Sequence, residues 1–357
     1  AGTTGTVDGS KNTGGINVTL TNSGARDVTV TGGTGNDRAD FSNGFAAKDS
    51  FTGGAGTDTL VLSNAVATGA VGGTLSGVEV LEVSAGGNGT IDLSKFAGVS
   101  EVVFTSAHDV AGGNSLAGAT SVTKAGATST VSLDAGNLAQ NLTVSVATDG
   151  AADATTINLN KVGTADAMGT LTVTDIETLT VNVADDAAVL GTGVLTVAGI
   201  SGNKLATVNV TSNADVTITG AVGGAALKSF DLSAATGKAT LTGGITTALT
   251  GATIKLGAGD DKVTVNATTG TATGGDTITL GAGKDVVTYT ALAQSGDKTT
   301  DTITDFKSGE DKLDLTAAGI LLNTSEKFLG VRDSFGLAQG ALTKEAGQAV
   351  FQADTST

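Results

Sequence analysis

Cysteine, proline and tryptophan are absent from this chain of 357 residues, and Met168, Tyr289 and His108 are the single representatives of their types. Without cysteine the chain can form neither a disulfide nor a thiolate metal site. Aromatic residues make up only 3% of the chain, which excludes a wide core built on large rings. No run approaches the roughly 20 consecutive apolar residues that a membrane-spanning helix needs.

Basic residues are scarce relative to acidic ones. Lys and Arg number 19 against 35 Asp and Glu, which gives a net charge of −16. This balance argues against nucleic acid or an anionic membrane as a partner, because both bind basic patches. It favours cations instead. Arg26, Arg38 and Arg332 are the only arginines, which also argues against bidentate recognition of phosphate.

The abundant residues are glycine, with 54 copies, and small or β-branched side chains. Val, Ile and Thr favour strands because their branched side chains suit a pleated surface. They alternate with polar residues over short runs that end in Gly, Asn, Asp, Ser or Ala, as at residues 16–20, 142–146, 208–210 and 216–218. Period-two runs with such boundaries predict short strands joined by turns. The fold class is therefore predicted to be all-β.

An internal repeat favours a β-solenoid over a sandwich or a barrel. Residues 74–83 and 171–181 share an aliphatic-Glu-x-Leu-x-Val core, in which Glu79 and Glu177 lie 177 − 79 = 98 residues apart. Looser units follow at residues 205–210 and 227–232. Such repeats are typical of rungs that stack on one another.

Four stretches share the pattern Gly-Gly-x-Gly-x-Asp-x-apolar, with Leu in place of the first Gly in the last two. They are residues 32–37, 53–60, 256–263 and 280–287. A weaker unit at residues 271–279 adjoins the fourth, so Asp276 and Asp285 lie 285 − 276 = 9 residues apart. A nine-residue period predicts successive turns on alternate sides of a flattened helix, with an ion between turns stacked on the same side.

Glycine and aspartate at these offsets suit a hard cation. Ca²⁺ takes about six to eight oxygen ligands at about 2.3–2.6 Å. Tightly coiled turns can offer backbone carbonyls where glycine tolerates a positive φ, and each Asp adds a carboxylate. Ordinary hairpin turns are the alternative, but they do not require glycine at three fixed offsets. We therefore predict Ca²⁺ as the cofactor.

The pattern resembles the calcium-binding nonapeptide of repeats-in-toxin (RTX) proteins, most clearly at residues 53–60 and in the tandem units at 271–288. Residues 301–315 look like the Asp-Phe-x-x-Gly-x-Asp-x-aliphatic-Asp-Leu element that follows RTX β-rolls in proteins exported by type I secretion. The resemblance implies a parallel β-roll whose carboxylates and backbone carbonyls bind calcium at Gly32, Thr34, Asp37, Gly53, Ala55, Asp58, Gly257, Gly259, Asp261, Asp276, Gly281, Gly283 and Asp285, with Asp305, Asp311 and Asp314 closing the last site.

The motifs divide the chain into three predicted segments. Residues 1–62 form an N-terminal β segment with RTX turns, and residues 63–250 form one β-solenoid or several small β-domains. Residues 251–357 form a C-terminal β-roll with a secretion-type tail, in which residues 321–352 are expected to mix helix and strand. The start of the chain is polar, shows no signal peptide and lacks Met, so we expect a processed product or a fragment.

Catalytic constellations are lacking, and we predict that the chain is not an enzyme. His108 lies beside Asp109, but no Gly-x-Ser-x-Gly segment supplies a nucleophile, so it is expected to be a solvated turn residue. The hint of a phosphate loop at residues 281–284 is followed by an Asp, which would repel phosphate. Glycoside hydrolysis needs only two carboxylates, but the aromatic platforms that hold sugars are missing. Glu79 and Glu82 are expected to line a strand face or pair with Lys.

The middle of the chain, with its Leu-x-x-Val-Glu-x-Leu-x-Val units, resembles RTX-type surface-layer proteins of Gram-negative bacteria. This resemblance implies a calcium-dependent, self-assembling structural protein of the bacterial cell surface, in a surface layer or an extracellular filament. The expected partners are further copies of the chain, calcium, and lipopolysaccharide or another surface glycan as an anchor. Two alternatives stay open, namely a stalk or binding module of an RTX adhesin and the calcium appendage of a secreted hydrolase.

Overall fold

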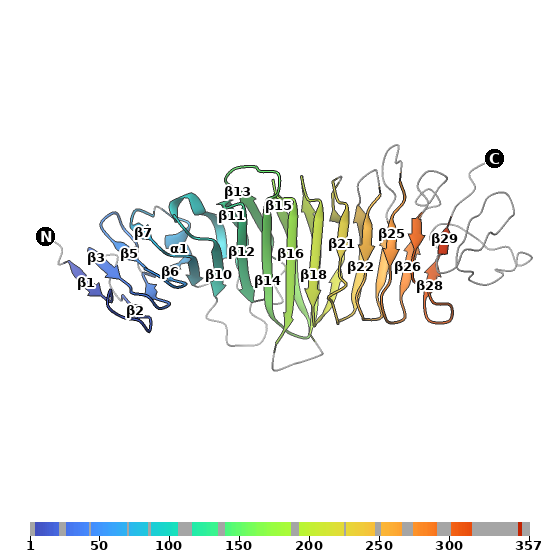
Figure 1. The fold of residues 1–357 in the computed structure, drawn as a ribbon, viewed down its shortest axis with the longest axis horizontal. Coiled ribbons are helices and arrows are strands. Elements are labelled where there is room, and N and C mark those ends of the chain that lie inside the picture. The colour runs from blue at the N-terminus through green and yellow to red at the C-terminus, as the bar shows by residue number, and fades with distance from the viewer. Residues whose placement is uncertain are drawn as a thin grey trace, which may run out of the picture.

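The protein is an elongated β-solenoid, in which rungs of short strands stack along one axis (Figure 1). This computed structural model describes residues 4–20, 26–42, 44–69, 71–84, 87–105, 116–134, 140–186, 193–224, 226–246, 251–265, 274–290, 301–315 and 349–351. His108 and residues 321–348 of the predicted tail lie outside these described residues. The predicted all-β, parallel solenoid is confirmed, because every strand pair in the described part of the chain is parallel except the last.

One face of the stack is a single long sheet of 14 described strands, which we call the long sheet. It runs in the order β2 (Asn17–Thr19), β4 (Arg38–Asp40), β6 (Thr59–Ser63), β8 (Val80–Ser84), β10 (Glu101–Thr105), β12 (Thr128–Asp134), β14 (Ala154–Val162), β16 (Thr178–Asp185), β18 (Thr207–Ser212), β21 (Ser229–Asp231), β23 (Thr253–Lys255), β25 (Thr277–Thr279), β27 (Asp301–Ile303) and β29 (Ala349–Phe351).

The opposite face is divided between two sheets. The first contains β1 (Gly5–Asp8), β3 (Val28–Thr31), β5 (Ser50–Thr52) and β7 (Thr74–Ser76). The second contains β9 (Gly87–Asp92), β11 (Leu116–Ala125), β13 (Leu142–Val146), β15 (Asp166–Thr174), β17 (Val194–Gly202), β19 (Asp215–Ile218), β20 (Val222–Gly223), β22 (Ala239–Thr246), β24 (Lys262–Val265), β26 (Val286–Tyr289) and β28 (Lys312–Asp314). The described helices are one short turn each, α1 (Asn64–Ala67) and η2 (Leu93–Lys95).

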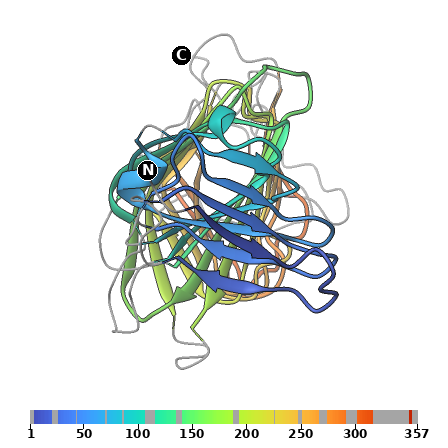
Figure 2. The same ribbon diagram turned by 90° about the vertical axis from the view of Figure 1, so that its left-hand side faces the viewer.

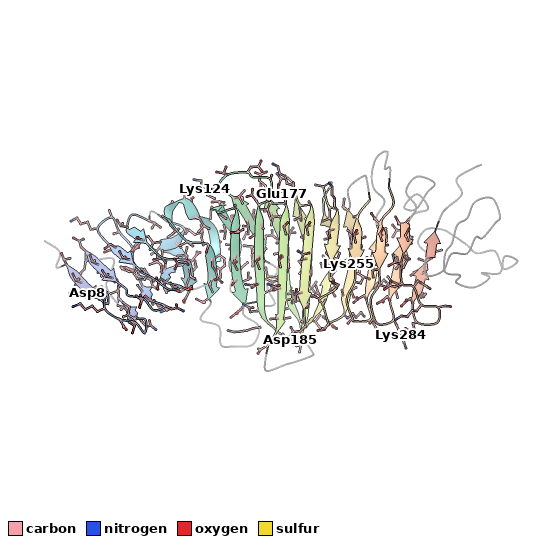
Figure 3. The ribbon with its side chains drawn as sticks, in the orientation of Figure 1. Asp8, Lys124, Glu177, Asp185, Lys255 and Lys284 are labelled. Atoms are coloured by element: carbon pink, nitrogen blue, oxygen red, sulfur yellow. The ribbon has the colours of Figure 1, made fainter. Side chains whose placement is uncertain are left out.

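The chain crosses between the two faces at two edges, which the view along the stack shows end-on (Figure 2). We call the edge where the chain turns into the long sheet the inbound edge, and the edge where it leaves the long sheet the outbound edge. Lys124 and Glu177 lie at the inbound edge, and Asp185 and Lys284 lie at the outbound edge (Figure 3). Backbone hydrogen bonds link successive turns along each edge, so equivalent residues stack in columns.

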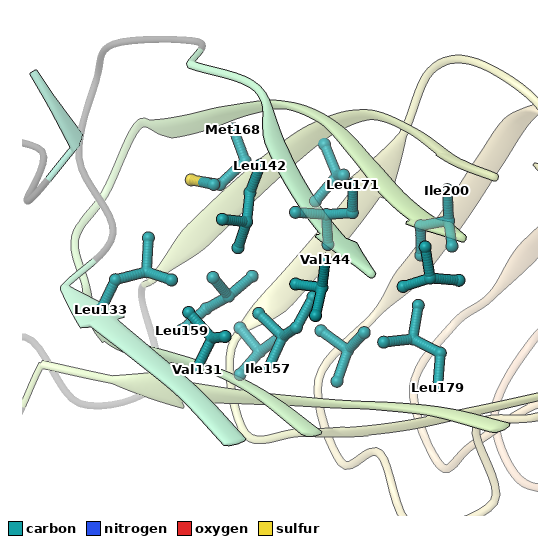
Figure 4. Packing of buried hydrophobic residues seen from close by; sticks show 14 of the residues in the cluster. Val131, Leu133, Leu142, Val144, Ile157, Leu159, Met168, Leu171, Leu179 and Ile200 are labelled. Carbon is teal, nitrogen blue, oxygen red and sulfur yellow. The ribbon is translucent and has the colours of Figure 1, made fainter. Parts of the chain in front are cut away.

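A single apolar core fills the space between the faces from Val28 to Ile303. Strand alternation builds it: in β14, Ile157 and Leu159 point inward and are fully buried, while Thr156 and Asn158 point outward. Facing side chains from the long sheet and from the opposite face interdigitate between the sheets (Figure 4). The long sheet and this core run through all three predicted segments in the described part of the chain.

The rungs are longer than two nine-residue units. Arg38 pairs with Thr59, Thr59 with Val80, and Val80 with Glu101, which is a repeat of 21 residues. Later rungs take 24 residues, as between Lys255 and Thr279. The nine-residue half-turn holds between Asp276 and Asp285, which the single strand β25 separates, and these two residues lie on opposite edges as predicted.

The internal repeat corresponds to equivalent places in the fold. Glu79 and Glu177 both stand at the inbound edge, directly before the long-sheet strands β8 and β16. Each accepts a hydrogen bond from the backbone N–H of an acidic residue one rung earlier, Asp58 at 2.9 Å and Asp153 at 2.8 Å. Glu82, which was expected to line a strand face or pair with Lys, lies in β8 and forms a bidentate ion pair with Arg38, its neighbour two strands away.

Candidate calcium-binding turns

The four Gly- and Asp-rich turns form two stacked pairs on opposite edges. Residues 32–37 and 53–58 join β3 to β4 and β5 to β6, so they stack on the inbound edge near one end of the rod. Residues 256–261 and 280–285 join β23 to β24 and β25 to β26, so they stack on the outbound edge near the other end. Sequence spacing alone shows the pairs but not their edges.

In the inbound pair, carboxylates connect adjacent rungs. Asp37 accepts hydrogen bonds from the backbone N–H of Ile16 at 2.6 Å and of Gly33 at 2.7 Å, so both of its oxygens have donors. Asp58 accepts one bond, at 2.7 Å, from the N–H of Asp37 to Oδ1. Its Oδ2 is buried and has no hydrogen-bond partner in the described part of the chain.

The outbound pair repeats this arrangement. Asp261 accepts bonds from the N–H of Ala239 at 2.7 Å and of Gly257 at 3.0 Å. Asp285 accepts the N–H of Asp261 at 2.9 Å through Oδ1, and its Oδ2 is again buried without a partner among the described residues. Each pair therefore has one carboxylate satisfied by amides and one with a free buried oxygen.

The glycine at the second position of each turn has a different conformation in the two kinds of turn. In the two turns with the free oxygen this glycine is Gly54 or Gly281, with φ of 118° and 92°. L-residues rarely adopt such values. With this conformation neither N–H binds the Asp of its own turn, whereas Gly33 and Gly257 donate to theirs.

Backbone carbonyls crowd the same spaces as the carboxylates. A Cβ atom on Gly53 would lie 2.0 Å from the carbonyl oxygen of Gly77 and 2.3 Å from Oδ2 of Asp58. A Cβ on Gly32 would lie 2.1 Å from Oδ2 of Asp37 and 2.2 Å from the carbonyl oxygen of Gly53. Only glycine leaves this space open, and oxygens from two adjacent rungs converge on it.

A third acidic residue continues each column. Glu79 accepts the N–H of Asp58, and Asp311 accepts the N–H of Asp285 at 3.1 Å. We call Asp37, Asp58 and Glu79 the inbound ladder, and Asp261, Asp285 and Asp311 the outbound ladder. From the sequence, Glu79 was expected to line a strand face or pair with Lys, so this role was missed, although the repeat that contains Glu79 was a usable signal.

The electrostatics of both ladders favour a cation. Burial raises the pKa of Asp58, and the charges of Asp37 and Glu79 raise it further. Burial also raises the pKa of Asp285 to about 6, with added repulsion from Asp261 and Asp311. A buried carboxylate with like charges on both sides is costly to ionise unless a positive charge joins it.

The other predicted ligands divide between the two edges. Asp305 joins the outbound edge and accepts the N–H of Leu280 at 2.7 Å and of Gly281 at 2.9 Å. Asp314 lies in β28 opposite Thr288 and is not part of the ladder. Asp276 lies on the inbound edge, where its N–H donates to Asp301 at 2.7 Å.

Asp301 is a further buried acid, and the sequence motifs did not place it among the metal ligands. Its Oδ2 accepts a hydrogen bond from the hydroxyl of Tyr289, the single tyrosine, at 3.0 Å. Burial raises the pKa of Asp301 to about 7. Its neighbours in sequence contain no glycine pattern, so no motif marks it.

No group of three or more carboxylate or imidazole side chains in the described residues is arranged to hold a metal ion. An ion at either ladder would therefore depend on one or two carboxylates together with backbone carbonyl oxygens. The donors present are all oxygens, which suits Ca²⁺ and excludes a site of the zinc type. The free oxygens of Asp58 and Asp285 and the open space at Gly53 fit such an ion.

Comparison with protein families points in the same direction. Residues 195–350 match the peptidase M10 serralysin C-terminal family. This region of the serralysin-type proteins is non-catalytic and typical of RTX-repeat proteins, which bind calcium and are secreted. The match covers the outbound ladder and not the inbound one. No curated protein and no solved structure matches the chain significantly. In the described residues no helix is long and apolar enough to cross a membrane.

Proposed function

We propose that this chain is a calcium-dependent, self-assembling structural protein of the bacterial cell surface, exported by type I secretion into a surface layer or filament. The observation that carries the calcium part is the free buried oxygen of Asp58 and Asp285. The same arrangement is built twice, on opposite edges and near opposite ends of the rod. A turn that served only to reverse the chain would not need an unpaired buried carboxylate, which costs free energy.

The residues that would hold calcium follow from the two ladders. At the inbound ladder they are Asp37 and Asp58 with the carbonyl oxygens of Gly53 and Gly77. At the outbound ladder they are Asp261 and Asp285, and the carbonyl oxygen of Gly257 lies 2.0 Å from where a Cβ of Gly281 would be. Bound calcium supplies the positive charge that offsets repulsion between the carboxylates of adjacent rungs.

The energetics suit a protein that folds after export. A site with micromolar affinity at millimolar calcium gains about 4 kcal/mol, and several such sites rival the stability of an ordinary domain. Where calcium is scarce, repulsion along the ladders opposes folding and keeps the chain open. Calcium outside the cell then couples binding to folding.

Support for a structural role comes from the regular architecture. The long sheet and the core continue without a break through the described residues, as a load-bearing or lattice-forming rod requires. We propose that the rod is anchored to the cell by lipopolysaccharide or another surface glycan.

Calorimetric titration and electron microscopy together test the proposal. We expect Ca²⁺ to bind with heat release, to raise the melting temperature, and to produce ordered arrays that EGTA disperses. Mg²⁺ at the same concentration serves as the control ion, because it demands tighter octahedral geometry. A melting curve that is the same in Ca²⁺ and EGTA would refute the calcium sites. Monomers under both conditions would refute self-assembly.

The family match favours a second candidate, the calcium-binding appendage of a secreted hydrolase. The matched region is the C-terminal part of a peptidase family. This candidate predicts calcium binding without arrays, and peptidase activity in a longer protein that contains the chain. An adhesin stalk differs from both, since it predicts an extended monomer that binds a surface sugar or protein.

A further inference from the structure

The outer surface of the long sheet carries an uncharged, regular array of small polar side chains. Paired residues of β12, β14, β16 and β18 form rows across the strands. The outward positions in the three rows that contain Thr178, Thr180 and Asn182 are called the neutral face. Every residue at these positions is Thr, Ser, Asn or Ala. The row through Thr180, for example, pairs Thr130 with Thr156, Thr156 with Thr180, and Thr180 with Asn209.

The strand pairing under the neutral face is regular. No bulge interrupts the pairing of β12 with β14 or of β16 with β18, and the shift between β14 and β16 occurs only beyond Leu159. Hydrogen bonds between side chains fix one row. Asn182 donates to Asn158 at 2.8 Å, and Asn158 donates to Ser132 at 3.0 Å. The opposite face is interrupted by register shifts between β9, β11 and β13.

The neutral face itself carries no charged side chain. The chain carries a net charge of −16, and the acidic ladders stand on the two edges. On the long sheet around the neutral face, Glu82 pairs with Arg38 and Asp231 with Lys255, and Glu101, beside Thr130, accepts a hydrogen bond from Ser132 at 2.8 Å. Exposed like charges repel over roughly 10 Å at 0.1 M salt, so two copies approach each other best through a surface without them.

We propose that the neutral face binds the same face of a second copy of this chain, and this inference rests on the proposed self-assembly. Another copy is the partner whose side chains repeat with the same strand spacing of about 4.8 Å. If the contact continues along the long sheet beyond the neutral face to β27, across the ion-paired Asp231 and Lys255, it covers about 600 Å² per copy, which reaches the lower range of specific interfaces. A sugar partner would call for aromatic platforms, and the chain has no Trp and a single, buried Tyr.

The variant Thr180→Lys tests the contact by placing a charge inside the neutral face. Lys255 occupies the same row three strands further on, so the fold accommodates a lysine there. Two lysines facing each other would repel, and we expect the dissociation constant of self-association in calcium to rise at least tenfold in sedimentation velocity. The matched control is Thr172→Lys, at an outward position of β15 on the opposite face, which should associate like the wild type. Circular dichroism and calcium-dependent melting check that both variants fold.

A charge-reversal experiment excludes a trivial folding defect. Thr180→Asp alone should also weaken association, and an equimolar mixture of Thr180→Lys and Thr180→Asp should restore it. Wild-type association in T180K would overturn this contact while leaving self-assembly intact. Wild-type monomers at every concentration in calcium would instead remove the proposed self-assembly. Binding of purified lipopolysaccharide that T180K abolishes, with chain–chain association unchanged, would assign the face to the glycan and overturn the inference.

Discussion

Asp37 and Asp58 occupy the same place in successive turns, yet their oxygens are used differently. Both oxygens of Asp37 accept amides, whereas Oδ2 of Asp58 is free. Asp58→Asn keeps Oδ1 as an acceptor and places its amide near the carbonyl oxygen of Gly77. We therefore expect unchanged or higher stability in EGTA, and loss of the calcium gain of this site, about 4 kcal/mol at a thousandfold excess over Kd.

Asp37→Asn is the matched comparison for this prediction. The amide NH₂ that this substitution introduces would have to face the N–H of Ile16 or of Gly33, which are both donors. We therefore expect the free energy of unfolding to fall by about 1–3 kcal/mol in EGTA as well as in calcium. Urea unfolding of both variants with and without calcium measures the difference. If both variants lose the same stability in EGTA, the free oxygen of Asp58 does not have the role assigned to it.

The conformation of one glycine is a second prediction at this scale. Gly281 has a φ of 92°, and a Cβ there would lie 2.0 Å from the carbonyl oxygen of Gly257. Gly281→Ala should lower the free energy of unfolding by about 1–3 kcal/mol and weaken calcium binding at the outbound ladder. Gly126→Ala is the control, because its Cβ would meet only ordinary contact at 3.5 Å from Thr128. Equal stability of the two variants in urea would contradict the assignment.

At the scale of the turn and its rung, the raised pKa values predict an inverted pH dependence. The pKa of Asp285 is about 6 and that of Asp301 about 7 in the folded protein, against 3.8 for an ordinary Asp. A raised folded pKa contributes stability that is present below the unfolded pKa and lost as pH rises through the folded value. In EGTA the melting temperature should therefore fall as pH rises from about 5 to 7.5.

Calcium should reverse that slope, because its ligands must be ionised. Affinity should weaken below about pH 6, where Asp285 becomes protonated. The double variant Asp285→Asn and Asp301→Asn should flatten the melting temperature between pH 5 and 7.5 in EGTA. If the calcium-free protein instead becomes more stable from pH 5 to 7.5, burial does not raise the pKa values of Asp285 and Asp301.

The elements also show what the sequence could and could not predict. Strand alternation and the Glu79 and Glu177 repeat were enough for an all-β solenoid, since both are local patterns, and the parallel arrangement came from the resemblance to RTX proteins. The edge on which each turn lies was not predictable, because it depends on the lengths of the turns between strands. Glu79 was missed as a ladder member, and Asp301 as the partner of Asp276, because the residues that they contact lie 21 and 25 residues away in the chain. The predicted boundaries at residues 62 and 250 stay a prediction.

For the whole molecule, the placement of the ladders near the two ends of the rod makes its stability uneven. In a solenoid each rung contacts only its neighbours, so the effect of a lost ion stays local. The rungs of β12, β14, β16 and β18 lie between the ladders and depend on the apolar core around Ile157 and Leu179.

Removing calcium should therefore loosen the ends and spare the middle. We expect amide hydrogen exchange in EGTA to accelerate at least tenfold over residues 28–63 and 253–314, where the ladders bind adjacent rungs. Exchange over residues 128–212 should change less than twofold, because burial there holds the strands without ions. Asp58→Asn in calcium should reproduce the effect at residues 28–63 alone, and Asp285→Asn at residues 253–314 alone. Uniform acceleration along the chain would mean that the rod unfolds as one cooperative unit, in which calcium acts on the whole molecule and not at its ends.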